Sequence, residues 1–139
     1  MLRYILRELL RRRLGAICLA ILAVLYAATV LSQFLAPYLP TNQDLKHAYH
    51  PPTKIVLQDW WPHVQVYERV DPSAARYEPV EGEAVPLRFL VSGEEYRFLG
   101  LFPTDTHLFG VDKPHRVYLL GSDATGRDVF SRLLYGAQV

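Results

Sequence analysis

Twenty-three consecutive residues near the amino terminus carry no charged side chain. This run, LGAICLAILAVLYAATVLSQFLA, extends from Leu14 to Ala36. As a helix it would be about 35 Å long, which is enough to cross a hydrocarbon core of about 30 Å. A core helix of a soluble protein is normally shorter and amphipathic, whereas this run is apolar all round. The pattern therefore predicts a transmembrane helix over residues 14–36.

The charges on the two sides of this run differ. Residues 1–13 contain five arginines and one acid, Glu8, whereas residues 37–139 contain ten basic and thirteen acidic side chains. By the positive-inside rule, the arginine-rich side of a span stays in the cytoplasm. The sequence therefore predicts a cytoplasmic basic tail over residues 1–13 and an extracytoplasmic location for residues 37–139.

A cleaved signal peptide is the main alternative to a retained span, because it also has a basic start and an apolar stretch. That stretch usually has about 7 to 15 residues, and the present run is longer. The best small-residue cleavage pattern, Val30-Leu31-Ser32, lies deep inside the run. A retained span is therefore favoured.

The composition excludes two broad classes of protein. With 50% hydrophobic residues, 21% charged residues and a net charge of +1, the chain is too apolar to be disordered and too evenly charged for a typical nucleic-acid binder. The one cysteine, Cys18, lies in the predicted span. The external part must therefore fold without an internal disulfide.

The segment after the span has the pattern of a small β-rich domain. Pro37 and Pro40 cannot continue a helix, and residues 37–53 are predicted to be an extended connector. Residues 54–120 then form the predicted β-rich domain, in which turn residues separate short runs of β-branched and aromatic residues. The predicted strands are Lys54 to Gln58, His63 to Glu68, Leu87 to Val91, Tyr96 to Phe102 and Arg116 to Leu120, with residues 87–102 as a hairpin around Ser92-Gly93-Glu94-Glu95.

Motifs for catalysis or cofactor binding do not occur in the sequence. It has no GxxxxGK[ST] loop, no GxGxxG after a strand and no GxSxG elbow. Of the five histidines, only His47 and His50 are three residues apart, in a connector where the convergent ligands of a zinc site are not expected. We therefore predict that the chain is not an enzyme and holds no cofactor or metal.

Two further clusters are interpreted as structural. Glu78, Glu81 and Glu83 flank a proline and a glycine, and this spacing favours a solvated loop over a calcium site. Trp60 and Trp61 could stack on a ligand or lie at the membrane surface, but large aromatic residues in a small β domain are more often buried. We expect both in the core or at an interface.

The segment 121–139, GSDATGRDVFSRLLYGAQV, has the pattern of a capped amphipathic helix. Thr125 and Asp128 fit the capping box [ST]xx[DE], in which each side chain satisfies a free backbone N–H group. Asp128 and Arg132 are spaced for an ion pair along the helix. The helix could contact a membrane surface or a partner, or be an ordinary capped helix. One predicted face carries the apolar residues Val129, Phe130, Leu133, Leu134 and Ala137.

The residues from Leu120 to Ala137 closely resemble the LGTDxxGRDxxSRLxYGAR segment of permease subunits in the dipeptide, oligopeptide and nickel ABC importers. Phe34 to Tyr38 also resembles the FAPY or LAPY sequence that closes the first span of these subunits. The external link is much longer here, as in the branch with an enlarged insertion, and Gln138 replaces the usual arginine. The matching motif residues, for which we expect structural or interface roles, are Gly121, Asp123, Gly126, Arg127, Asp128, Arg132, Tyr135 and Gly136.

This resemblance implies the amino-terminal portion of a C-type permease subunit in a bacterial or archaeal plasma (inner) membrane. Its fold would be membrane α+β, with one amino-terminal transmembrane helix, a small β-rich extracytoplasmic domain and a carboxyl-terminal amphipathic helix that leads to a second span. The implied partners are membrane lipid, a second permease subunit, two cytoplasmic ATPase subunits and an extracytoplasmic solute-binding protein, with no nucleic acid. The alternative is a stand-alone single-span protein whose external domain binds a partner, or a secreted domain. The transported solute cannot be read from this sequence.

Overall fold

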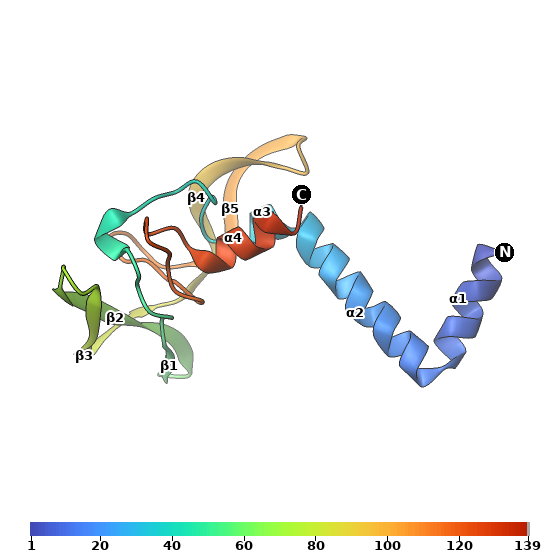
Figure 1. Cartoon of the computed structure of the whole chain (residues 1–139), viewed down its shortest axis with the longest axis horizontal. Coiled ribbons are helices and arrows are strands. Elements are labelled where there is room, and N and C mark those ends of the chain that lie inside the picture. Colours follow the sequence, from blue (N-terminus) through green and yellow to red (C-terminus); the bar gives the residue numbers. More distant parts are fainter. Residues whose placement is uncertain (139) are drawn as a thin grey trace.

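The computed structural model describes residues 1–138, apart from the side chains of residues 2, 3, 6 and 9. Val139, the last residue of the predicted segment 121–139, lies outside the described residues. A helical arm at the amino terminus extends away from a β-rich body (Figure 1). Both this arrangement and the short helix at the carboxyl end agree with the predicted fold class.

The arm consists of α1 (Leu2–Arg11) and α2 (Arg13–Val30), and a short α3 (Ser32–Leu35) follows at the body. Arg12 has extended dihedral angles (φ −93°, ψ 120°), so the chain bends there. The basic segment is thus helical, as its many leucines and arginines favour. No residue of α2 is buried, and α2 is long and apolar enough to cross a membrane.

The predicted single helix over residues 14–36 is interrupted at Leu31. Leu31 has φ −92° and ψ 6°, outside the α-helical range, and α3 continues after it. Ser32 is fully buried, whereas the residues of α2 are not. The interruption therefore marks the point where the helix leaves its apolar surroundings and packs on the body.

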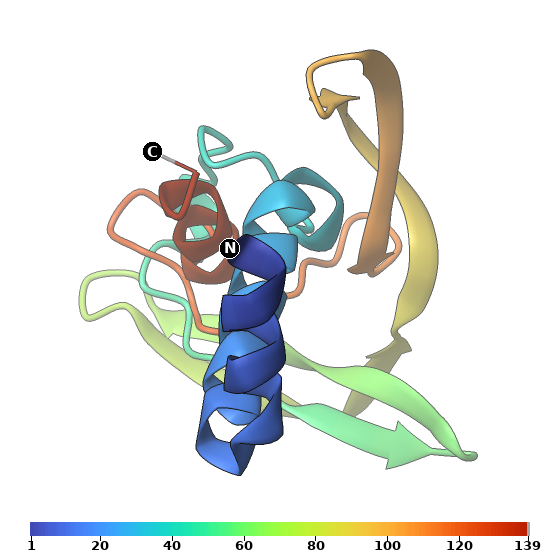
Figure 2. The same ribbon diagram turned by 90° about the vertical axis from the view of Figure 1, so that its right-hand side faces the viewer.

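Two antiparallel sheets form the body (Figure 2). The first contains β1 (Ile55–Gln58), β2 (Trp61–Asp71) and β3 (Arg76–Pro86), in that order. The second is the hairpin of β4 (Arg88–Phe98) and β5 (Phe102–Gly110). The helix α4 (Val129–Gly136) lies beside α3 near the outer end of α2 (Figure 1).

Three of the strand predictions were wrong. The acidic segment with Glu78, Glu81 and Glu83 is β3 and not a loop, although all three side chains are exposed. The predicted turn at residues 92–95 is a bulge inside β4, because β4 finds a continuous partner in β5 and the hairpin turns at residues 99–101. Residues 116–120 form no strand, since their backbone groups bond to Tyr38 and Thr53 instead.

The hydrophobic core lies where the two sheets meet the segment after β5. Val64 of β2, Leu87 between the sheets and Val117 are buried together. The residues packed against them, which are partly buried, are Val85, Phe109, Val111 and Leu119. Trp60 lies outside this core, fully exposed in the turn between β1 and β2. Of the two locations predicted for it, the core is therefore wrong, and the interface stays a prediction. Trp61 is partly exposed, and its Nε1 donates to the carbonyl oxygen of Leu87 at 2.7 Å.

Candidate functional site

The motif residues from Gly121 to Asp128 form a tight loop before α4, and Asp123 is its centre. The Oδ1 atom of Asp123 accepts hydrogen bonds from the backbone N–H groups of Thr125 (2.9 Å) and Arg127 (3.0 Å) and from the Thr125 hydroxyl (2.8 Å). Its Oδ2 atom pairs with Nε of Arg127 at 2.9 Å and Nη1 of Arg132 at 2.7 Å. One carboxylate thus ties the loop together and joins it to α4.

The environment of Asp123 stabilises its ionised form. Burial opposes ionisation, but the hydrogen bonds from Arg127 and Thr125 outweigh it and hold the pKa of Asp123 well below its usual value. The carboxylate is therefore a fixed negative charge between two guanidinium groups. This arrangement suits a structural tie, because charge-assisted hydrogen bonds are the strong ones.

Two glycines let the loop approach the connector at residues 44–52. Gly121 (φ 79°) and Gly126 (φ 73°) have left-handed dihedral angles that glycine adopts readily. A Cβ atom on Gly121 would lie 2.7 Å from the carbonyl oxygen of His50, and one on Gly126 would lie 1.8 Å from that of Asp44. Both positions therefore exclude side chains.

Hydrogen bonds join the same two segments. The backbone N–H of Ser122 donates to His50 O at 2.9 Å, and the N–H of His50 donates to the Ser122 hydroxyl at 2.8 Å. The Ser122 hydroxyl donates in turn to His47 O, and the N–H of Tyr49 donates to Asp123 O at 3.0 Å. The motif loop and the connector are thus one folded unit, although about 70 residues separate them along the chain.

Asp128 caps α4, which corrects the predicted capping box. Its Oδ2 atom accepts hydrogen bonds from the N–H group (2.9 Å) and the hydroxyl (2.6 Å) of Ser131. The helix begins at Val129, so Thr125 lies too early to cap it and bonds to Asp123. The predicted ion pair of Asp128 with Arg132 was also wrong, because Arg132 reaches back to Asp123. Asp128 is buried, and burial raises its pKa.

The exposed and buried sides of α4 differ from the predicted ones. Ser131, expected on the polar face, is fully buried against the end of the membrane helix, and its hydroxyl accepts a hydrogen bond from Tyr38 N at 3.3 Å. Leu133, expected on the apolar face, is 63% exposed. Tyr135 is half-buried, and Gly136 is exposed with open space around its Cα atom. These last two motif residues are not part of the loop cluster.

A cluster of aromatic side chains packs around His50 of the connector. The His50 ring lies between those of Tyr77 (4.8 Å), Tyr118 (5.0 Å) and Tyr67 (5.3 Å), measured between ring centroids. Burial lowers the pKa of His50 to about 4, so the ring is neutral near pH 7. His47 pairs with Asp44 instead, at 2.8 Å. Within residues 1–138 as described, no three His, Cys, Asp or Glu side chains are placed to hold a metal ion.

Arg116 fastens the segment after β5 to the connector. Its guanidinium group stacks on the ring of Tyr38 (4.2 Å to the centroid), donates to Oδ1 of Asn42 at 2.8 Å, and lies 3.5 Å from a carboxylate oxygen of Asp44. The Tyr38 hydroxyl in turn accepts from Val117 N at 2.9 Å. Residues 116–120, predicted as a strand, therefore form an irregular segment that is bound to the connector by these contacts.

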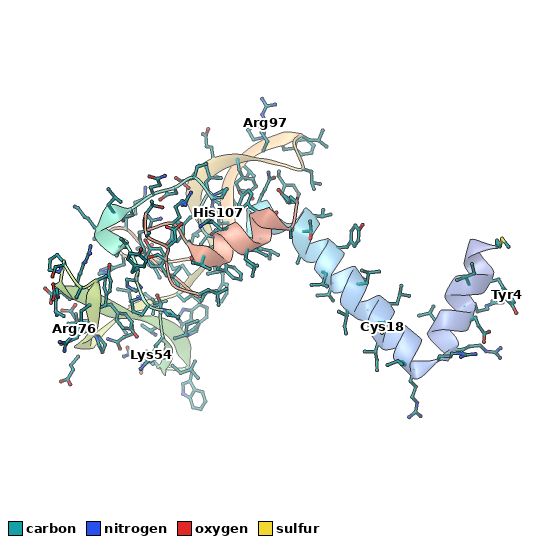
Figure 3. The ribbon with its side chains drawn as sticks, in the orientation of Figure 1. Tyr4, Cys18, Lys54, Arg76, Arg97 and His107 are labelled. Carbon is teal, nitrogen blue, oxygen red and sulfur yellow. The ribbon has the colours of Figure 1, made fainter. Side chains whose placement is uncertain are left out.

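The hairpin of β4 and β5 holds the outer end of the membrane helix. His107 is fully buried, with Nδ1 2.6 Å from Ala36 O and Nε2 3.1 Å from Glu94 O (Figure 3). The Glu94 carboxylate accepts from Leu39 N at 2.9 Å and from the Asn42 amide at 2.5 Å. No local pattern in the sequence marked His107 or Glu94, because their partners Ala36, Leu39 and Asn42 lie more than 50 residues away.

An open cleft lies between the first half of β4, the segment after β5 and the connector. Its volume is about 1310 Å³, and its walls include residues 86–94 on one side and residues 110–116 on the other. Arg88 and Asp112 form an ion pair at its rim (2.6 Å), and Lys113 beside them is exposed. The cleft offers a solvent-accessible surface on the body in which apolar and polar groups are mixed.

Residues 1–52 match the family model described as the N-terminal TM domain of oligopeptide transport permease C. No curated protein and no solved structure matches the chain. The match covers the arm, the helix junction and the connector as far as Pro52, and together with the apolar helix α2 it indicates a location in a membrane. Over these 52 residues the resemblance inferred from the sequence is confirmed: this part of the chain is similar to the N-terminal membrane domain of oligopeptide transport permease C.

Proposed function

We propose that the chain is the amino-terminal part of a permease subunit in an ABC importer for peptides or similar small solutes. The observation that carries this proposal is a contact between two regions. Residues 1–52 match the permease domain, and the separate motif at residues 120–137 resembles the same family. The structure packs Gly121 and Gly126 of the motif directly on His50 and Asp44 of the matching region.

The 67 residues of segment 54–120 then form an insertion that loops out between two contiguous family regions. Thr53 and Tyr118, close to its two ends, are joined by hydrogen bonds of 2.8 Å and 3.0 Å. Such closely placed ends are what an inserted domain requires, because the host fold is then undisturbed. This arrangement supports an enlarged external insertion over a short external link.

In this function the span α2 serves as an anchor. The polar groups of a solute need partners inside the bilayer, and α2 offers almost none. A second permease subunit and further spans therefore line the route, and two cytoplasmic ATPase subunits supply the energy. The arginine-rich segment lies in the cytoplasm of a bacterial or archaeal cell and residues 37–139 lie outside the plasma membrane, because arginines flank only one end of the span.

The uptake of labelled oligopeptides tests this proposal. Cells without the gene for this protein should lose ATP-dependent uptake, and a plasmid copy should restore it. A copy with Gly126→Val should restore little, because the side chain would displace the connector. Normal uptake in the deletion strain, with the protein shown to be absent, would contradict the proposal, as would failure to copurify with an ATPase subunit.

The external insertion is proposed to contact the delivering solute-binding protein or to cover the outer mouth, with the cleft as the docking face. The double change Arg88→Glu and Lys113→Glu reverses the charge at the cleft rim and should lower the affinity for the binding protein about tenfold. Arg97→Glu, an exposed position near the tip of the β4–β5 hairpin and outside the cleft lining (Figure 3), is the matched control and should leave the affinity unchanged. Equal affinity in all three proteins would argue against docking at the cleft.

A further inference from the structure

The turn between β1 and β2 has an unusual residue at its tip. Gln58 pairs with Trp61, so Asp59 and Trp60 are the two turn residues, with φ 50° and φ 63°. Turns of this kind favour glycine at the second position, because other residues are strained at positive φ. Trp60 is nevertheless found there, and its side chain is 100% exposed. Neither the turn nor the packing of the described chain accounts for a tryptophan at this position.

Other exposed apolar side chains lie on the turn beside Trp60 and at the start of β4. Leu57 is 77% exposed, and Trp61 contacts the ring of Phe89 edge to face, with 6.0 Å between the centroids. Leu90, the neighbour of Phe89, is also exposed. We call this group, consisting of Leu57, Trp60, Trp61, Phe89 and Leu90, the tip patch. The contact between Trp61 and Phe89 joins the exposed residues of the turn to those at the start of β4. Exposed apolar side chains gathered in this way mark a surface that contacts another apolar phase.

The fold directs the tip patch toward the membrane. In Figures 1 and 2 α2 runs downward from the body, and the β1 side of the three-stranded sheet lies at the lower edge of the body, displaced sideways from α2. The hairpin of β4 and β5 extends to the opposite side in both views. Because α2 defines where the bilayer lies, the β1–β2 turn reaches toward the bilayer surface and the β4–β5 turn points away from it.

We propose that the tip patch inserts into the interface of the membrane that α2 spans, so that lipid is its occupant. Tryptophan favours this interface because its ring is apolar while its N–H group can reach water or headgroups. The charged residues nearest the turn, Lys54 and Asp59, cancel each other. The attachment therefore comes from burial of apolar area and does not need anionic lipid. It gives the external domain a second point of attachment, beside the span.

Tryptophan fluorescence tests this proposal directly, because Trp60 and Trp61 are the two tryptophans of the sequence. The variant Trp61→Phe, with the whole 139-residue chain reconstituted in phosphatidylcholine vesicles, leaves Trp60 as the sole reporter. We expect a blue-shifted emission, quenching by lipids brominated on their acyl chains, and at least threefold protection from acrylamide. Emission typical of water with full acrylamide quenching would overturn the proposal. Quenching that appears only with anionic lipid would overturn the apolar attachment.

Two further variants control for fold and orientation. Trp60→Gly suits the positive φ of the turn, so circular dichroism should be unchanged while quenching of the remaining Trp61 by brominated lipid falls at least twofold. Leu101→Trp, with both natural tryptophans changed to Phe, places the reporter on the opposite hairpin tip and should remain open to acrylamide. Equal lipid quenching at both tips would contradict the proposal. Resistance to carbonate extraction in each variant verifies that α2 is inserted, so these outcomes do not depend on transport.

Discussion

Gly126 lies so close to Asp44 that a Cβ atom on it would be 1.8 Å from the carbonyl oxygen of Asp44. This distance is far below any van der Waals contact, and the opposing atom is backbone that cannot rotate away. The contact joins the motif loop to the connector at a point where backbone packs against backbone, so neither segment can move aside for a side chain.

We therefore expect Gly126→Ala to destabilise the fold by about 3 kcal/mol or more, through the clash and the positive φ. Gly136→Ala is the matched control, because Gly136 ends α4 with open space around it and alanine is the better helix former. Denaturant unfolding in detergent, followed by circular dichroism, compares the two. Similar midpoints for both variants would contradict the close approach at Gly126.

The stability of the external domain should fall as the pH is lowered from about 6.5 to about 4. Burial lowers the pKa of His50 from its ordinary 6.5 to about 4, so the folded state disfavours the protonated ring. The stability that the neutral ring maintains is fully present above pH 6.5 and is lost as the pH falls toward 4, on the order of 3 kcal/mol. Unfolding midpoints measured across this range should show the loss.

His50→Phe keeps an aromatic ring among Tyr67, Tyr77 and Tyr118 but cannot be protonated. It should remove most of the pH dependence between pH 6.5 and 4. His115→Gln, at an exposed histidine, should keep it. An undiminished pH dependence in His50→Phe would show that another group is responsible.

Asp123 adds a second loss of stability, in the same direction, at lower pH. Its pKa is held below the ordinary 3.8, so its ion pairs and hydrogen bonds stabilise the folded state above pH 3.8 and are lost as the pH falls below it. Asp123→Asn keeps the shape but removes the negative charge between Arg127 and Arg132. It should cost about 2 kcal/mol at pH 7 and progressively less on acidification below pH 3.8. A cost that is independent of pH would argue against the ionic tie.

Asp128→Ala should destabilise α4 by about 0.5 to 2 kcal/mol, because Ser131 loses the acceptor for its N–H group. Thr125→Ala is the comparison, since Thr125 donates only to Asp123 and caps nothing. We expect the alanine at position 125 to cost clearly less in the same unfolding measurement. A larger cost at Thr125 than at Asp128 would favour the capping box expected from the sequence.

The elements that depend on local pattern could be predicted from the sequence, and those that depend on distant partners could not. The apolar run of α2 and the region that contains α4 were correctly located, because length, polarity and turn chemistry act locally. The acidic strand β3 was missed because its pairing with β2 overrides the low strand propensity of its glutamates. Ser92-Gly93-Glu94-Glu95 resembles a turn, but Gly93 is needed because the His107 ring leaves no room for a Cβ atom.

The candidate site also contains a part that could be predicted from the sequence and a part that could not. The motif loop could be predicted because its residues lie together in the sequence. Its partners Asp44 and His50 could not, since only the folded chain brings them into contact with the loop. Thr125 was chosen as the helix cap because it fits a common pattern, but Asp128 itself has the position and the acceptor atoms to cap α4.

His107 and Glu94 hold the backbone of Ala36 and Leu39 at the point where a flexible hinge would otherwise begin. The external domain is therefore unable to swivel freely on the end of its membrane helix. With α2 spanning the membrane as proposed, a tilt or axial rotation of this helix would be passed on to the hairpin of β4 and β5 as a rigid-body movement. The proposed span would in this way be mechanically connected to the far side of the β-rich body.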